Sequence, residues 1–263
     1  MSGADQIIKE LTWDTEFFGC KIGRVNPEDG DLEAQDFVQI DKLAKQQRFK
    51  CLYLTLDTNR DHELSIAQQH GFIVYDTRVE LSLCLTSEDK QKQNADSDTA
   101  PSASPYPIRL ALPEDIEPLK EMAASSFHLS RFYQDPHFPK PLCDRLYATW
   151  IESEVLDEKV LVWVIQTNQA LSQEAPQPVH PLGFLSLKFK SNKDAQISLV
   201  GVAVKGKGLG SLLIQKTLSE IKQQGITSVT VATQASNEGA LRLYQKHGFK
   251  EQTRSANMHK WYS

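Results

Sequence analysis

A chain of 263 residues, 40% hydrophobic and 24% charged, has the size and composition of a folded globular protein with its own core. No apolar run approaches the roughly 20 residues that span a bilayer, which speaks against a membrane protein. The net charge of −5 is uneven, because residues 1–86 carry −6 and residues 107–263 carry +3. The C-terminal part therefore suits an anionic ligand better, although it lacks the strongly basic character of a nucleic-acid binder.

The cysteines and the first residues indicate the compartment. Cys20, Cys51, Cys84 and Cys143 are scattered and form no CxxC pair, which favours neither a zinc site nor a disulfide framework. The start, MSGADQIIKE, lacks the basic and apolar regions of a secretory signal. We therefore expect a cytoplasmic protein without a metal.

Two polar stretches divide the chain. Residues 87–107, rich in Ser, Asp, Lys, Gln and Pro, cannot bury a face and predict a linker. Residues 167–181 predict an elaborated hairpin loop between two strand-like runs. We expect an N-terminal domain at 1–86, a linker at 87–106 and a second domain at 107–263.

The second domain alternates strands and helices. We expect strands at 108–111, 160–166, 183–190, 195–204, 228–233, 249–253 and 256–262, and helices at 113–126, 141–154, 209–224 and 237–247. A parallel pair of strands flanks the helix at 209–224. This mixture predicts an α/β fold with a mixed sheet.

The N-terminal part resembles a worn copy of the C-terminal part. At a constant offset of 177, residues 33–81 align with 210–258 without a gap, and the sequence QQHGF at 68–72 lies on QKHGF at 245–249. Such self-similarity predicts a repeated supersecondary unit.

A glycine-rich turn carries the strongest local signal. Gly206, Gly208 and Gly210 follow the apolar run 200–204 and precede an amphipathic helix. This spacing lets backbone N–H groups approach a phosphate at a helix N-terminus, with Lys205 and Lys207 adding charge. No Gly-Lys-Ser/Thr follows, so the turn is not a P-loop, and the acidic residue of a dinucleotide fold is missing. A plain strand-to-helix turn remains an alternative.

A second pattern lies at Asn237, Ala240, Tyr244, Gly248 and Phe249. Asn237 and Tyr244 are two helical turns apart and share a face. Asn237 is equally typical of a helix N-cap, and Tyr244 of a core aromatic.

Together the two patterns resemble the GNAT superfamily of acetyl-CoA-dependent N-acetyltransferases. Its phosphate-binding motif, Gln/Arg-x-x-Gly-x-Gly/Ala, reads Lys205-Gly-Lys-Gly-Leu-Gly here, with lysine as a departure in the first position. The resemblance implies a C-terminal GNAT fold at 107–263 and a degenerate, partial GNAT-like domain at 1–86.

The resemblance also implies a cofactor site and a mechanism. Acetyl-CoA would lie where the strands near 197–204 and 228–233 splay apart, and Tyr244 would protonate the leaving thiolate as general acid. The residues expected to contact the cofactor are Val202, Val204, Lys205, Gly206, Lys207, Gly208, Leu209, Gly210 and Asn237. In the N-terminal copy, Ala67 takes the place of Tyr244 and acidic Asp29, Asp31 and Glu33 surround the turn, so we expect no cofactor there.

A narrower resemblance concerns the acceptor. Ser-Arg-Phe at 130–132, the later Tyr147…Trp150-Ile151 and the opening Leu-Thr-Trp…Phe-Phe-Gly at 11–19 are similar to TDP-fucosamine acetyltransferases. These enzymes act on the amino group of a nucleotide-linked 4-amino-4,6-dideoxy sugar. The resemblance implies substrate contacts from Arg131, Phe132 and Tyr133, and a possible homodimer.

Other acceptors stay open. An amino acid, a polyamine or a protein N-terminus would also fit a GNAT enzyme, and a non-catalytic acyl-CoA-binding module is a further alternative. His128 and His137 are candidate bases, although water-mediated deprotonation of the amine is equally compatible with the sequence.

Overall fold

The computed structural model describes residues 7–26, 32–85, 106–166 and 180–263. They form a mixed ten-stranded sheet with the strand order β1-β2-β3-β10-β4-β9-β8-β7-β6-β5. No helix within these ranges is long and apolar enough to cross a membrane. The expected linker at 87–106 and the loop at 167–181 lie almost wholly outside the described residues.

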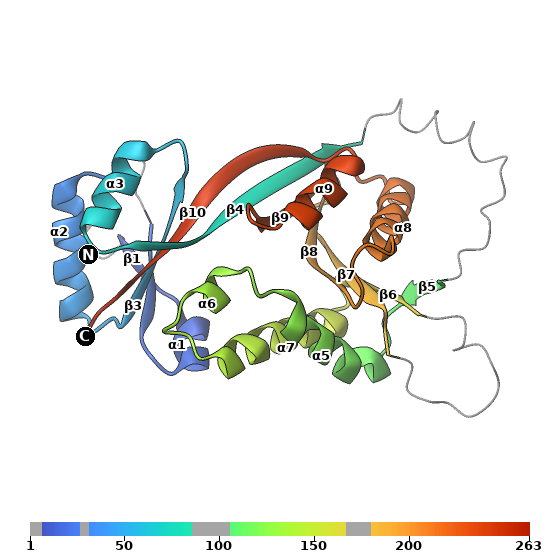
Figure 1. Ribbon diagram of the computed structural model, residues 1–263, viewed down its shortest axis with the longest axis horizontal. Helices are drawn as coiled ribbons and strands as arrows, with labels where there is room; N and C mark the ends of the chain where they lie inside the picture. Colours follow the sequence, from blue (N-terminus) through green and yellow to red (C-terminus); the bar gives the residue numbers. More distant parts are fainter. Residues whose placement is uncertain (1–6, 27–31, 86–105, 167–179) are drawn as a thin grey trace.

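The N-terminal half contributes four strands and three helices to the described structure (Figure 1). They are β1 (Ile8–Glu10), α1 (Thr12–Phe18), β2 (Ile22–Val25), α2 (Ala34–Gln46), β3 (Cys51–Asp57), α3 (Asp61–Gln69) and β4 (Ile73–Cys84).

The C-terminal half follows the predicted order of elements closely. Its elements are β5 (Ile108–Leu110), a 3-10 turn (Pro113–Asp115), α5 (Ile116–Ser126), α6 (Arg131–Gln134), α7 (Lys140–Leu156), β6 (Val160–Ile165), β7 (Gly183–Phe189), β8 (Asp194–Val202), α8 (Leu209–Gln223), β9 (Ser228–Gln234), α9 (Glu238–Lys246) and β10 (Lys250–Trp261). The prediction of two short closing strands, at 249–253 and 256–262, is wrong. They form one strand, β10, because β4 pairs with it along its length and β3 pairs with its second half.

The predicted internal repeat is confirmed by the element bounds. Adding 177 to the first and last residues of β3, α3 and β4 gives the bounds of β9, α9 and β10. Gly71 and Gly248 both follow the helix of their copy with φ = 85°, a left-handed conformation that favours glycine. The two copies therefore share their backbone path through the helix end and into the last strand.

The two copies exchange their last strands. β4 pairs antiparallel with β9 of the other half, and β10 pairs antiparallel with β3. The registers are equivalent under the same offset, since the pair Arg78↔Gln234 corresponds to Ser255↔Asp57. Arg78 and Ser255 also pair with each other, at the centre of the long β4–β10 ribbon that joins the halves in Figure 1.

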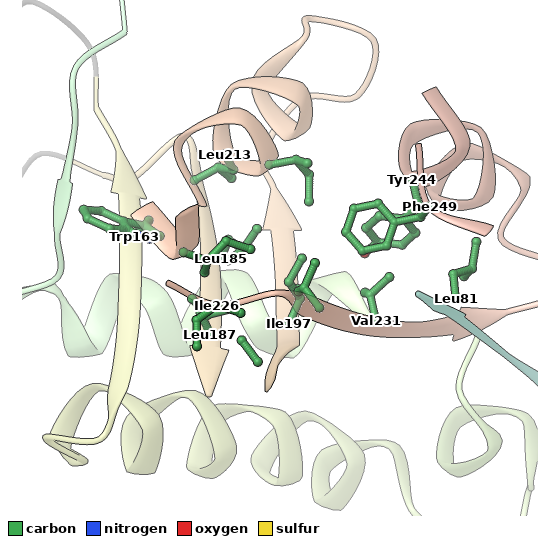
Figure 2. Packing of buried hydrophobic residues seen from close by; sticks show 14 of the residues in the cluster. Leu81, Trp163, Leu185, Leu187, Ile197, Leu213, Ile226, Val231, Tyr244 and Phe249 are labelled. Atoms are coloured by element: carbon green, nitrogen blue, oxygen red, sulfur yellow. The ribbon is translucent and has the colours of Figure 1, made fainter. Parts of the chain in front are cut away.

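Each hydrophobic core is completed by the strand from the other half. Ala256 and Met258 of β10 are buried in the N-terminal core beneath α2 and α3. Val79 and Leu81 of β4 are buried in the C-terminal core with Tyr244 and Phe249, and Figure 2 shows Leu81 beside Val231. Burying apolar surface is the main stabilising term in folding, so neither core is complete without the exchange.

Helices cover both faces of the C-terminal sheet. α8 and α9 pack on the face formed by Leu185, Ile197 and Val231. α5 and α7 pack on the opposite face, against Phe184 and Leu199. These two layers place the glycine turn on one side of the sheet and the α5–α7 segment on the other.

A buried carboxylate joins the end of β10, where it pairs with β3, to the segment that follows α6. Asp135, which follows α6, accepts hydrogen bonds from the rings of His259 (2.7 Å), Trp261 (2.8 Å) and His137 (2.8 Å). Burial alone would raise the pKa of Asp135, but these hydrogen bonds outweigh it and lower the pKa to about 2. Burial lowers the pKa of His259. The cluster thus holds an ionised carboxylate beside a mostly neutral imidazole.

Replacing this carboxylate tests its contribution to stability. We expect Asp135→Asn to lower the free energy of unfolding by about 2–4 kcal/mol, because buried donors lose a charged acceptor. The depressed pKa of Asp135 means that its stabilisation is present above the unfolded-state pKa of about 4 and is lost as the pH falls through about 2.

Urea unfolding at pH 7 and at several values between pH 4 and 2 measures both effects. In the variant, the fall of stability in this acid window becomes shallower. Asp194→Asn, at an exposed aspartate, is the control and should cost less than about 1 kcal/mol. An Asp135→Asn variant as stable as the control would contradict this role of the carboxylate.

Candidate functional site

Two neighbouring parallel strands separate in the middle of the C-terminal sheet. β8 and β9 pair from Asp194↔Ser228 to Ile197↔Val231, and no further pair follows between them. A β-bulge in β8 lies at the same level, where the backbone N–H of Leu199 donates to the side-chain Oγ of Ser186 on β7 (2.9 Å) instead of to a backbone carbonyl. A bulge redirects a strand and often lies beside a functional site. The predicted splay of these strands is therefore present.

A glycine keeps the separated strand close to its neighbour. A Cβ added at Gly201 would lie 2.4 Å from the Phe184 ring, so no side chain fits at this position. β8 can pass over Phe184 only with glycine there.

The separation opens into a large cavity of about 1820 Å³. Its walls come from both sides of the sheet: from the glycine turn and α9 on one side, and from α5, α7 and the segment at 127–129 on the other. This volume exceeds that of an ordinary small-ligand pocket and suits a long ligand together with a second molecule.

The glycine turn has the geometry of an anion cradle. Gly206 and Gly208 have φ of 78° and 77°, in the left-handed region. Gly208 is the N-cap of α8, a helix of 15 residues whose first backbone N–H groups and dipole favour negative charge. A Cβ at Gly210 would lie 2.9 Å from Leu243, so this glycine lets α8 and α9 approach closely.

Most of the predicted cofactor residues line this cavity. They are Val202, Val204, Lys205, Gly206, Gly208, Leu209, Gly210 and Asn237. Lys207 is exposed and is not among the lining residues. Asn237 also caps α9, since its side-chain oxygen accepts from the Ala240 N–H at 3.3 Å. The helix-cap interpretation of Asn237 is thus observed, and its contact with a cofactor stays a prediction.

Tyr244 lines the same cavity from α9 and is otherwise buried, with 4% of its surface exposed. Burial raises the pKa of its phenol well above the usual value, because the charged phenolate is disfavoured in an apolar environment. The core-aromatic interpretation of Tyr244 is also observed, since its ring packs on Phe249. The hydroxyl group therefore stays protonated at neutral pH at the edge of the cavity.

The opposite side of the cavity includes His128 and the motif residues Tyr147 and Trp150, but the polar network there was not predicted from the sequence. This network contains Ser198, Trp150 and Lys188, which line the cavity. All three donate to one oxygen of the buried Glu154, at 2.5, 2.7 and 2.7 Å respectively. The other oxygen has no partner in the described part of the chain. Only the fold brings α7, β7 and β8 together here, so no sequence motif reveals this network.

The three predicted substrate residues lie outside the lining of the cavity. The backbone N–H of Arg131 donates to Asp76 (2.7 Å), and its guanidinium lies 4.7 Å from the Tyr53 ring centre. Phe132 packs in an aromatic cluster at the junction of the halves. The Tyr133 hydroxyl lies 2.7 Å from the Ala124 carbonyl oxygen and 2.6 Å from an Asp144 carboxylate oxygen, and its one proton can be donated to either acceptor. Their proposed substrate contacts remain untested.

The candidate bases lie in different surroundings. His128 is exposed and lines the cavity, whereas His137 is bonded to Asp135 at the junction. Within the described ranges, no group of three or more His, Cys, Asp or Glu side chains is placed to hold a metal ion.

The N-terminal copy has different residues at the equivalent positions. Ala67, in the place of Tyr244, is fully buried in the N-terminal core. Glu33 is the N-cap of α2 and forms a capping box with Asp36. Asp29 and Asp31 lie outside the described residues. A phenol that could donate a proton is therefore missing at this position.

Comparisons with known proteins agree with this geometry. Residues 127–249 match the acetyltransferase (GNAT) family. The chain is 29% identical over 246 residues to the dTDP-fucosamine acetyltransferase of Escherichia coli O6:H1, covering 92% of each protein.

Two solved structures share the fold at a TM-score of 0.60. One is a tandem GNAT protein from the clavulanic acid biosynthesis pathway, at 15% identity, covering 92% of this chain and 76% of that chain. The other is a GCN5-related N-acetyltransferase from Sphaerobacter thermophilus, at 17% identity, covering 92% of this chain and 72% of that chain.

These comparisons confirm the predicted fold, a C-terminal GNAT fold with a partial copy at the N-terminus. They also confirm the predicted enzyme class, an acetyl-CoA-dependent N-acetyltransferase. The chain thus carries, at residues 127–249, a domain of the acetyltransferase (GNAT) family.

Proposed function

We propose that this enzyme transfers the acetyl group of acetyl-CoA to the amino group of a nucleotide-linked 4-amino-4,6-dideoxy sugar. The observation that carries the proposal is one cavity that passes through the splayed sheet and joins the glycine turn to the α5–α7 side. The similarity to a dTDP-fucosamine acetyltransferase along 92% of the chain supports the sugar as acceptor. A different amine, such as an amino acid, a polyamine or a protein N-terminus, is the second candidate.

The residues of the cavity fit coenzyme A. Its pyrophosphate would rest on the backbone N–H groups from Lys205 to Gly210, where two left-handed glycines and the α8 N-terminus favour an anion. Its pantetheine arm would run along the free edge of β8 at Val202, which has no strand partner on the β9 side, and past Val204 just beyond the end of the strand. Asn237 would contact it from the start of α9.

The chemistry needs a neutral amine and a proton donor. The amine attacks the carbonyl carbon of the thioester, the C–S bond breaks, and the thiolate of coenzyme A leaves. Tyr244 would donate its phenolic proton to that sulfur, and the amine proton would pass to water or to a base on the acceptor side. Because burial raises the pKa of Tyr244, the phenol is still protonated at the pH at which the acceptor amine first becomes neutral.

Removing the phenolic hydroxyl tests the role of Tyr244. We expect Tyr244→Phe to lower kcat about 100- to 1000-fold and to leave acetyl-CoA binding unchanged, since the ring still fills its buried place. Tyr262→Phe is the matched control, because that hydroxyl bonds to Asp41 in the N-terminal half, far along the sheet from the cavity. A Tyr244→Phe enzyme that keeps more than a third of the wild-type kcat would exclude the phenol as general acid.

The pH dependence of the rate provides an independent check. The rate should rise with pH as the acceptor ammonium loses its proton. It should show no decline up to about pH 10, because the raised pKa of Tyr244 keeps the acid form present. A decline that begins below pH 9 and disappears in Tyr244→Phe would show that the phenol titrates in its ordinary range.

A glycine-to-alanine pair tests the cradle. An alanine held at φ = 77° strains the backbone by about 1–2 kcal/mol. A Cβ at Gly208 would meet no atom within 4 Å, so the substitution disturbs the conformation of the turn without a steric clash. We expect Gly208→Ala to raise the KM for acetyl-CoA about 5- to 30-fold. Gly225→Ala is the control, since Gly225 has φ = 76° in equally open space at the other end of α8. Equal KM values in the two variants would contradict a binding role for the turn.

The acceptor is tested by release of free thiol from acetyl-CoA. TDP-linked 4-amino-4,6-dideoxyhexoses are compared with amino acids, polyamines and a peptide with a free N-terminus. We expect release with the nucleotide sugar alone. Release with one of the other amines instead would keep the enzyme class and reject the sugar.

A further inference from the structure

The strand exchange brings one side chain of the N-terminal half into the cavity. Among the described residues up to Leu85, Arg78 alone lines it. Arg78 lies on β4, beside Gln234 at the end of β9. If β4 paired with β3 of its own copy, Arg78 would be carried to the N-terminal end of the sheet. The cavity therefore receives this arginine only because the strands are exchanged.

The pleat of β4 places Arg78 on the acceptor side. Val79 and Leu81 point into the core under α8 and α9, the side of the glycine turn. Successive side chains of a strand alternate between faces, so Arg78 and Glu80 point to the opposite face, toward the α5–α7 layer. On that face Arg78 lies beside Gln234, and across the cavity lie the residues at 127–129.

The guanidinium is available for an anion. Within the described ranges, the guanidinium forms an ion pair with Glu80 at 3.1 Å, and both side chains are more than a third exposed, at 40% and 35%. Exposed ion pairs of this kind contribute little to stability, so a bound anion can displace Glu80 from the guanidinium or share it. Arginine suits this role because its planar group binds a phosphate through two parallel N–H donors.

The cavity as a whole favours negative charge. Six cationic side chains line it, against two anionic ones: Arg78, Lys188, Lys190, Lys205, Arg242 and Lys246, against Glu121 and Glu238. Lys205, Arg242 and Lys246 lie on the side of the glycine turn and α9, where the proposed cofactor phosphates would bind. Arg78, Lys188 and Lys190 remain for the acceptor, and Lys188 is engaged by Glu154 at 2.7 Å.

We propose that Arg78 binds the diphosphate of the acceptor, so that the degenerate half supplies a specificity-determining residue to the active half. This inference rests on the proposed function. It assigns to Arg78 a substrate contact of the kind that the sequence resemblance implied for Arg131. Arg131 does not line the cavity, and its guanidinium lies between the Tyr53 and Phe132 rings. Arg131 therefore shapes the junction between the halves, and the anion contact falls to Arg78.

The test compares two acceptors that carry the same amino sugar, one linked to a nucleoside diphosphate and one a simple methyl glycoside. We expect Arg78→Ala to raise the KM for the nucleotide-linked acceptor about 10- to 100-fold, the range for a lost hydrogen bond to a charged group. The KM for the methyl glycoside and for acetyl-CoA should change less than about twofold. Arg78→Lys, which keeps the charge but loses the planar fork, should fall between these values.

A matched control lies on the other exchanged strand. Arg254 on β10 forms an ion pair with Glu251, as Arg78 does with Glu80, but Arg254 does not line the cavity. Arg254→Ala should leave every KM unchanged. Circular dichroism and urea unfolding of each variant separate a loss of recognition from a loss of folding.

The outcomes separate this inference from the proposed function. An equal rise of KM for both acceptors, or no rise for either, would overturn the role of Arg78 even if the sugar is the substrate. If the wild-type enzyme acetylates a different amine that bears a phosphate or carboxylate, the sugar assignment fails. A KM increase in Arg78→Ala for that anionic acceptor would still support the role of Arg78 in binding the anionic group. Activity only toward amines that carry no anionic group would overturn both the sugar assignment and the role of Arg78.

Discussion

The exchange of β4 and β10 between the two halves determines how their sheets and cores are joined. Each strand leaves its own copy, crosses to the other and pairs there in an equivalent register. Because β4 and β10 also pair with each other, the two sheets become one, and the two cores are tied by the same pair of strands. The halves therefore fold as partners, although their sequences read as separate repeats.

The active cleft arises from local departures from a regular sheet. β8 and β9 stop pairing after Ile197↔Val231, the bulge at Leu199 is closed by the Ser186 hydroxyl, and Gly201 passes over Phe184 without a side chain. Each departure weakens a sheet in which regular pairing would be more stable. The packed layers of α5, α7, α8 and α9 compensate for this cost, so a hollow through the sheet persists in a stable domain.

Much of this architecture could be predicted from the sequence, because its signals are local. The alternation of apolar residues located the strands and helices of the C-terminal half, and the offset of 177 between QQHGF and QKHGF located the repeat. The glycine turn and Tyr244 were found by motif, and both line the cavity. Their chemical roles are proposals that rest on this placement.

The remaining features depend on contacts between distant segments. The apolar pattern of β4 and β10 is the same whichever half they join, so no periodicity reveals the exchange. Arg78 and Glu154 carry no motif. Arg78 lines the cavity only through the pairing of β4. Glu154 lies behind the wall and accepts a hydrogen bond from Ser198 only through the packing of α7. Arg131 illustrates the opposite case, since its motif is clear but its side chain lies at the junction of the halves.

Two fused copies form one sheet, and we propose a single coenzyme A site, at the glycine turn of the C-terminal copy. Isothermal titration of the full chain with coenzyme A counts the sites. We expect a stoichiometry of one coenzyme A per chain, with binding weakened by Gly208→Ala. Two sites per chain, or one site unaffected by Gly208→Ala, would contradict this proposal.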